Sequence, residues 1–150
     1  MNFNGILKSL VAQHSFSIPR LVKKFEIPNS GVLHVGANFG QEADLYDELG
    51  FENVYWIEGY PVFINKLKAT IASRKNHHII EAMVSDISGE EVNFSVTSNT
   101  GSSTLLEPTE IWHKTFNEIK IVEKKKIICK RLDEVLEAEL DAIELKKLSF

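Results

Sequence analysis

Cysteine and long apolar runs are both scarce in this sequence. Its 150 residues include one cysteine, Cys129, so an intrachain disulfide framework is excluded. No stretch reaches the roughly 18 consecutive apolar residues of a membrane span, and the N-terminus lacks the basic and apolar regions of a signal peptide. We therefore expect a cytoplasmic protein in a reducing compartment, without membrane contact, in which Cys129 is a buried structural thiol.

Positive charge is also limited. The 17 Lys and Arg residues are outnumbered by 21 Asp and Glu, and the basic runs are short, among them Lys23-Lys24 and Lys124-Lys125-Lys126. Proteins that neutralise a nucleic-acid backbone need a clustered basic face. We predict no nucleic-acid partner and no metal site, and we interpret both basic runs as solvated surface.

The middle of the chain alternates strand and helix patterns, and its length suits one domain. Short apolar strands are predicted at 32–35, 54–57 and 77–84, with helices at 41–49 and from Pro61 to Ile71 between them. This order is typical of an α/β fold with a doubly wound parallel sheet. Right-handed crossovers would place the three strands in the spatial order 3-2-1, with strand 32–35 buried.

The flanking segments have other patterns. Helices are predicted at 4–14 and 19–25, so residues 1–30 are expected to form a helical lead-in and residues 31–150 the domain. After the Ser88-Gly89 turn, Val92, Phe94 and Val96 alternate with polar residues, which predicts an antiparallel strand at 91–97. The remaining expectations are a polar loop at 99–108, a helix at 110–119, a strand at 121–130 and a helical or mixed segment at 132–148.

The strongest candidate site is the turn after the first strand. Gly36 and Gly40 allow the backbone to turn sharply and to approach a ligand closely. Dinucleotide folds place an acidic residue about twenty residues beyond such a turn, where it accepts hydrogen bonds from two ribose hydroxyls. Glu58, at the end of the second strand, suits this role. The alternative is that the glycines only form a tight turn and that Glu58 is a solvated strand end.

The sequence of this turn also indicates which nucleotide cofactor it could bind. Asn38 stands where the second glycine of the G-x-G-x-x-G fingerprint would approach a pyrophosphate. The Gly-Lys-Ser/Thr sequence of a P-loop is absent as well. S-adenosylmethionine has no phosphate, so a looser turn is sufficient for it, and the pattern favours this cofactor.

An ordered series of motifs resembles the FkbM-type methyltransferases over about residues 31–137. The motifs are Val35-Gly36-Ala37-Asn38-Phe39-Gly40-Gln41, Ile57-Glu58-x-x-Pro61, Ala82-Met83-Val84-Ser85-Asp86-x-Ser88-Gly89, the serine-rich loop Thr100-Gly101-Ser102-Ser103-Thr104-Leu105, and Leu132-Asp133-Glu134-Val135. The resemblance implies a Rossmann-like class I methyltransferase fold. It also implies methyl transfer from S-adenosylmethionine to a hydroxyl oxygen of a sugar, another glycan or a small secondary metabolite.

The resemblance also implies roles for individual residues. Gly36, Ala37, Asn38 and Gly40 would line the methionine side of the cofactor, Glu58 would hold the ribose, and Glu81 to Met83 would border the adenine. Two positions depart from the family. His34 stands where these enzymes often have Asp, and could equally be a strand histidine with its hydrogen bonds satisfied. Gly59 replaces a proline, which is expected to loosen the turn without removing the carboxylate.

The end of the sequence is the largest departure. In the family, a fourth core strand follows the segment that begins at Leu132-Asp133, and this chain ends at Phe150, near the expected start of that strand. We therefore expect a truncated domain that does not turn over a methyl acceptor by itself, with strand 32–35 as an open edge through which copies could associate. The alternative is a non-catalytic nucleotide-binding or interaction module.

No residue is predicted to be the catalytic base. Four residues qualify by type alone, and each is more simply a solvated surface residue; they are His77, His78, Asp86 and His113.

Overall fold

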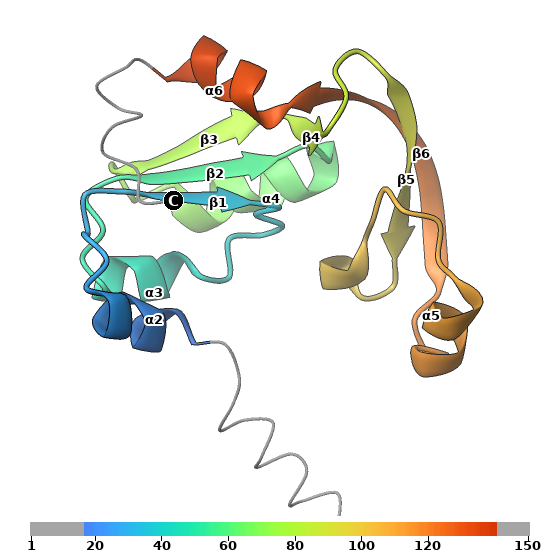
Figure 1. Ribbon diagram of the computed structural model, residues 1–150, viewed down its shortest axis with the longest axis horizontal. Helices are drawn as coiled ribbons and strands as arrows, with labels where there is room; N and C mark the ends of the chain where they lie inside the picture. Colours follow the sequence, from blue (N-terminus) through green and yellow to red (C-terminus); the bar gives the residue numbers. More distant parts are fainter. Residues whose placement is uncertain (1–16, 141–150) are drawn as a thin grey trace, which may run out of the picture.

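A computed structural model describes residues 17–140 of the protein. The expected helix at 4–14 and the segment from 141 onward lie outside the described residues. Two three-stranded sheets form the framework, and helices cover the first of them (Figure 1). The protein is thus a mixed α/β protein with a parallel sheet, as predicted.

The first sheet contains β1 (Val32–Val35), β2 (Val54–Glu58) and β3 (His77–Glu81). Its strands are parallel and lie in the order β1-β2-β3, so the predicted 3-2-1 order is confirmed. All five residues of β2 are buried. β1 is only half-buried, and Val35 is exposed, because β1 is an edge strand of the sheet formed by the described residues. The prediction of a buried first strand was therefore wrong, whereas the expectation that this strand lies at an edge agrees with the described residues.

Helices pack on both faces of this sheet. One face is covered by α3 (Ala43–Glu48) and α4 (Pro61–Ile71), and the other by α6 (Leu132–Glu139) (Figure 1). Because successive side chains of a strand point to opposite faces, Trp56 packs with the α3 and α4 side and Ile57 with α6. A further helix, α2 (Ile18–Phe25), packs Ile18 and Val22 against the Trp56 cluster.

The helix bounds differ slightly from the predicted ones. α3 ends before Gly50, whose φ of +72° suits the residue beyond a helix C-terminus. The apolar stripe of α4 is confirmed, and its four members are buried: Phe63, Ile64, Leu67 and Ile71. The predicted helix at 110–119 is shorter, because α5 (Glu110–Thr115) ends where Phe116 leaves helical geometry.

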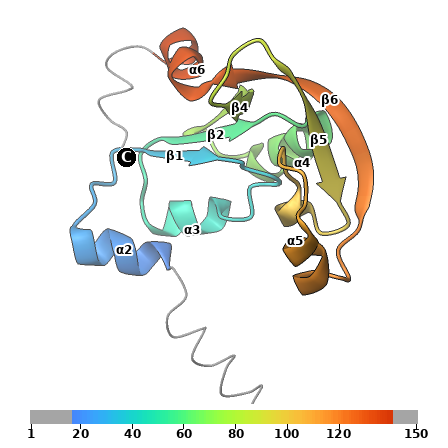
Figure 2. The same cartoon turned by 45° about the vertical axis from the view of Figure 1, so that its right-hand side comes forward.

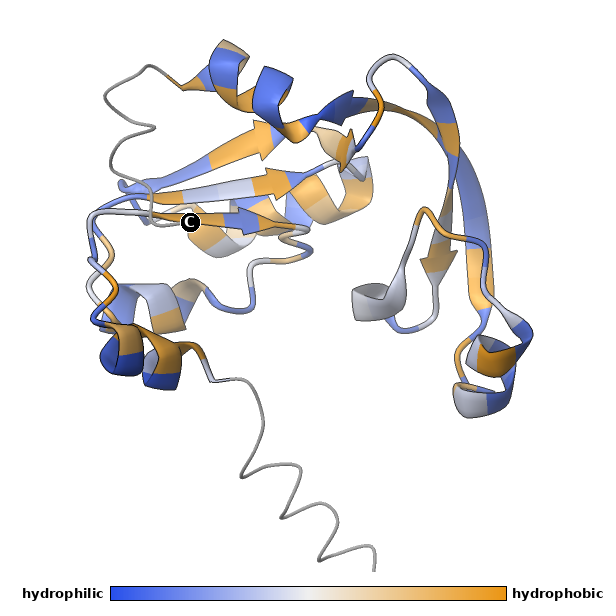
Figure 3. Cartoon of the chain, in the orientation of Figure 1, coloured by the Kyte–Doolittle hydropathy of each residue, from blue (hydrophilic) through white to orange (hydrophobic). Residues whose placement is uncertain are grey.

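The second sheet consists of β4 (Met83–Ser85), β5 (Glu91–Thr97) and β6 (Ile121–Arg131), in the order β4-β6-β5. β5 and β6 are antiparallel, which confirms both predicted strands. Their ribbon stands at the carboxyl ends of the first sheet's strands (Figures 1 and 2). β6 is hydrophilic along its middle, where the lysine run lies (Figure 3), and Cys129 is its one buried residue.

The single strand predicted at 77–84 is two strands in two sheets. β3 ends at Glu81, Ala82 donates its backbone N–H to the Glu58 carbonyl at 3.0 Å, and Met83 begins β4, which pairs in parallel with β6. The apolar run continues across Ala82, so the residue pattern alone does not show this change of sheet. None of the described helices is long and apolar enough to cross a membrane.

Candidate functional site

The turn from β1 to α3 has a left-handed backbone at three positions. Gly36, Asn38 and Gly40 have φ values of +79°, +50° and +72°. Glycine adopts this region freely, and asparagine is among the few other residues that tolerate it. The N–H groups of Gly36 and Ala37 both donate to the Ile57 carbonyl, at 2.9 and 3.1 Å, so the turn is fixed to the end of β2.

The four predicted residues of this turn have different surroundings. Gly36 and Asn38 line a pocket, and a Cβ added to Gly36 would meet no atom within 4 Å. Ala37 is buried in the core. Gly40 is buried too, and a Cβ there would lie 2.7 Å from Leu67 Cδ1. Gly36 and Asn38 therefore face the pocket, whereas Ala37 and Gly40 shape the turn beneath it.

Glu58 connects the two strand ends. Its Oε2 accepts the N–H of Asn38 at 2.8 Å, and its Oε1 accepts the N–H groups of Gly59 and Tyr60, both at 2.9 Å. The residue is 6% exposed and also lines the pocket. An ionised carboxylate has about four lone-pair positions. Three are occupied, so about one, on Oε2, is left for a ligand, instead of the two expected for a ribose diol.

Gly59 tightens the turn, contrary to the expectation that it would loosen it. A Cβ at this position would lie 2.5 Å from Met83 Cα and 2.6 Å from Met83 N, a distance that real Cβ atoms do not reach. Proline would add this bulk and would also remove the N–H that Glu58 accepts. The glycine is thus required where β4 crosses the end of β2.

The opposite side of the pocket comes from the serine-rich loop, which contains the 3-10 turn η1 (Thr100–Ser102). Five of its residues line the pocket, and we call the three that carry hydroxyls, Thr100, Ser103 and Thr104, the hydroxyl wall. Asn38 Nδ2 donates to Thr100 Oγ1 at 3.2 Å, which joins this wall to the glycine turn. The family resemblance contained this loop, but nothing in its residues indicated that it would close the pocket.

The pocket has a volume of about 450 Å³, within the range of small-molecule sites. Strand ends of the first sheet form one side, and β4, β5 and the hydroxyl wall form the other. Among the described lining residues, Glu58 is the single charged side chain, and none is Lys, Arg or His. Ala82 and Met83 line the pocket; Glu81 does not, and its carboxylate pairs with Lys68.

The histidines near the first sheet have structural roles. His34 Nδ1 lies 2.9 Å from the Tyr46 hydroxyl, as expected for a strand histidine with satisfied hydrogen bonds. His77 is buried, so its interpretation as a surface residue was wrong. His78, Asp86 and His113 are exposed, as predicted, and none of them lines the pocket.

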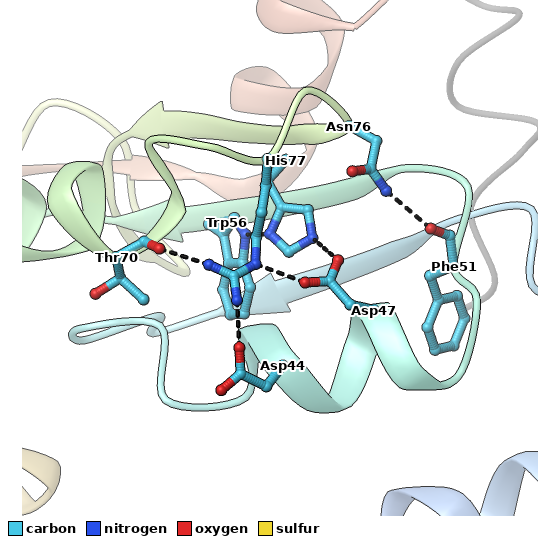
Figure 4. A network of polar contacts seen from close by, with 8 residues as sticks. Asp44, Asp47, Phe51, Trp56, Thr70, Asn76 and His77 are labelled. Atoms are coloured by element: carbon cyan, nitrogen blue, oxygen red, sulfur yellow. Dashed lines mark hydrogen bonds and ion pairs between the residues drawn. The ribbon is translucent and has the colours of Figure 1, made fainter.

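A polar network surrounds His77 (Figure 4). Trp56 Nε1 donates to His77 Nδ1 at 3.2 Å, so the ring proton is on Nε2, which lies 3.1 Å from Asp47 Oδ1. Arg74 donates to Asp47 at 2.6 Å and also pairs with Asp44. Burial lowers the pKa of His77, and the Asp47 carboxylate opposes this change. Because its hydrogen bonds are satisfied by the protein, His77 stabilises the fold and is no candidate base.

Comparison with known proteins adds no relative: no protein-family model, curated protein or solved structure matches the chain.

Proposed function

We propose that this chain binds S-adenosylmethionine as a Rossmann-like methyltransferase of the FkbM type, and that the methyl acceptor is a hydroxyl oxygen of a glycan or another small molecule. The observation that carries the proposal is the position of Glu58. Its carboxylate lies at the end of β2 and lines the pocket, it accepts a hydrogen bond from the glycine turn, and about one of its lone pairs is not used by the protein.

The residues present fit the cofactor. Gly36 leaves open space where any side chain would intrude into the pocket. Asn38 Oδ1 is buried beside the pocket without a hydrogen-bond partner among the described residues, and buried acceptors normally have one. The lining holds a carboxylate and no cation, which suits a sulfonium and disfavours the phosphates of a dinucleotide.

In this proposal the protein accelerates methyl transfer mainly by holding the reacting groups in alignment. Bound S-adenosylmethionine supplies an electrophilic methyl group on its sulfonium sulfur. Glu58 accepts a ribose hydroxyl, and Gly36 leaves space for the ligand. Alignment of this kind can contribute about 7–11 kcal/mol to a two-substrate reaction. The catalytic base is left without a candidate.

Calorimetry with S-adenosylhomocysteine tests the proposal. We expect the protein to bind this product and to bind AMP at least about tenfold more weakly, because the phosphate is repelled by Glu58. Glu58→Gln should weaken S-adenosylhomocysteine binding by about tenfold or more, since hydrogen bonds to a charged group are worth about 1.5–3 kcal/mol.

The matched control is Glu81→Gln. Glu81 is the register partner of Glu58 on the next strand, but it is exposed and lies outside the pocket lining. This variant should bind S-adenosylhomocysteine like the wild type. Equal loss in the two variants, or tighter binding of AMP than of S-adenosylhomocysteine by the wild type, would contradict the proposed cofactor.

A further inference from the structure

Each member of the hydroxyl wall already accepts a hydrogen bond from the protein. Thr100 Oγ1 accepts from Asn38 Nδ2 at 3.2 Å, Ser103 Oγ from the Thr97 N–H at 3.1 Å, and Thr104 Oγ1 from the Leu106 N–H at 3.0 Å. A hydroxyl has one proton to donate and two lone pairs. Each of the three hydroxyls therefore keeps its O–H proton and one lone pair, so the wall can donate three hydrogen bonds to a ligand.

The carboxylate on the other side of the pocket has no proton to donate. Glu58 can only accept, and about one of its lone pairs is unused. Asn38 lies between the two sides, because its backbone N–H donates to Glu58 and its side-chain amide to Thr100. A ligand with a hydrogen-bond donor toward Glu58 and acceptors toward the hydroxyl wall is complementary to these two sides of the pocket.

Charge restricts the acceptor end of this ligand. No Lys, Arg or His belongs to the described lining, and the carboxylate of Glu58 faces the same pocket. A phosphate dianion would be repelled there without a compensating cation. A carboxylate that carries its own ammonium neighbour has no net charge, so neutral O–H donors are sufficient to hold it.

We propose that the hydroxyl wall binds the carboxylate of the amino-acid end of an S-adenosyl ligand, while Glu58 holds the nucleoside end. This assignment rests on the proposed function. It makes Thr100, Ser103 and Thr104 specificity residues that distinguish the amino-acid-bearing ligand from a bare nucleoside.

Calorimetry with two ligands tests the assignment in the full chain. S-adenosylhomocysteine carries the amino-acid end, and 5′-methylthioadenosine has the same nucleoside and sulfur without it. We expect the wild type to bind S-adenosylhomocysteine at least about tenfold more tightly. Thr100→Val, Ser103→Ala and Thr104→Val should each weaken its binding about three- to tenfold, and leave 5′-methylthioadenosine within about twofold.

Two controls separate binding from folding. Thr100→Ser keeps the hydroxyl and should keep the wild-type preference, whereas Ser85→Ala removes a pocket hydroxyl that already donates to Asp86 and should change neither affinity. If a wall variant fails to fold in a urea titration, decarboxylated S-adenosylhomocysteine gives the same comparison in the wild type. It should bind as weakly as 5′-methylthioadenosine.

The outcomes distinguish this inference from the proposed function. Equal affinity of the wild type for the two ligands, or equal weakening of both by the wall variants, overturns the role of the hydroxyl wall and leaves the proposed function standing. Failure of the wild type to bind either ligand contradicts the proposed function, and this assignment with it.

Discussion

The two sheets of this protein are stabilised in different ways. In the first sheet, β2 is buried along its whole length, between α3 and α4 on one face and α6 on the other. In the second sheet, β6 has eleven residues and only Cys129 is buried. The second sheet therefore depends on its backbone ladder, on an apolar cluster against α4 that contains Tyr60, Phe63, Phe94 and Val96, and on Val84 of β4, which packs against the α6 side.

The two sheets accordingly contribute different parts of the pocket. The first sheet holds Glu58 and the glycine turn on strand ends that are fixed by packing from both faces. The second sheet contributes the hydroxyl wall, which Asn38 joins to the first sheet through the Thr100 hydrogen bond. The pocket thus has one rigid side and one side that depends on how the sheets meet. Their junction at Gly59 is the most sensitive point.

Gly59→Ala should have the largest effect on stability. The new Cβ would lie 2.5 Å from the Met83 backbone, which cannot move unless β4 separates from the end of β2. We expect a loss of about 3 kcal/mol in the free energy of unfolding, the upper end of the usual cost of overpacking. Urea unfolding measures this loss.

Gly89→Ala is the matched control for that substitution. Gly89 has a φ of +79° and open space around it, so alanine there meets only the backbone penalty of about 1–2 kcal/mol. If the two variants lost the same stability, the close approach of β4 would not be the reason that position 59 requires glycine.

The first sheet could be predicted from local patterns because each of its elements carries its own signal. Apolar strands followed by stripes such as Phe63, Ile64 and Leu67 specify strand and helix from neighbouring residues alone. Turn chemistry placed Gly36 and Glu58 at adjacent strand ends, where the structure has them. The half-burial of β1 does not follow from its own apolar residues, which suggested a buried strand; it follows from the edge position that was expected for this strand.

The second sheet shows the limit of such patterns. The alternation of Val92, Phe94 and Val96 predicted β5, but nothing in residues 83–85 indicates that they pair with β6, about 45 positions later. The prediction that His77 is a surface residue was wrong for a similar reason. Its two hydrogen-bond partners, Trp56 and Asp47, are 21 and 30 residues away, so its burial follows from tertiary packing.

His77 should make the stability of the first sheet depend on pH. Burial lowers its pKa in the folded protein below the ordinary value of 6.5, so the unfolded chain binds a proton more readily. Its contribution to stability is complete above about pH 6.5 and is lost as the pH falls toward the folded-state pKa. Protonation of Nδ1 would also remove the hydrogen bond from Trp56.

Urea unfolding at pH 7.5 and at pH 5.5 measures this effect in the wild type and in His77→Gln, which cannot titrate at this position. The wild type should lose more stability on acidification than the variant. Burial lowers the pKa of His34 too, and this second histidine is present in both proteins, so it cancels in the comparison. An identical pH dependence would mean that the pKa of His77 is the same in the folded and the unfolded protein.

The smallest effect is expected on the outer face of β6. Ile128 is 63% exposed and faces Glu91 across the ladder, so Ile128→Thr keeps a β-branched side chain and removes little buried area. We expect a change within about 0.5 kcal/mol in urea unfolding. The same substitution at Ile57, 1% exposed on β2, should cost about 2–3 kcal/mol, because it removes a packed methyl group and buries a hydroxyl. A comparable loss at both positions would contradict the difference between the sheets. It would mean that the outer face of β6 is covered in solution, and the stability of the wild type would then rise with protein concentration.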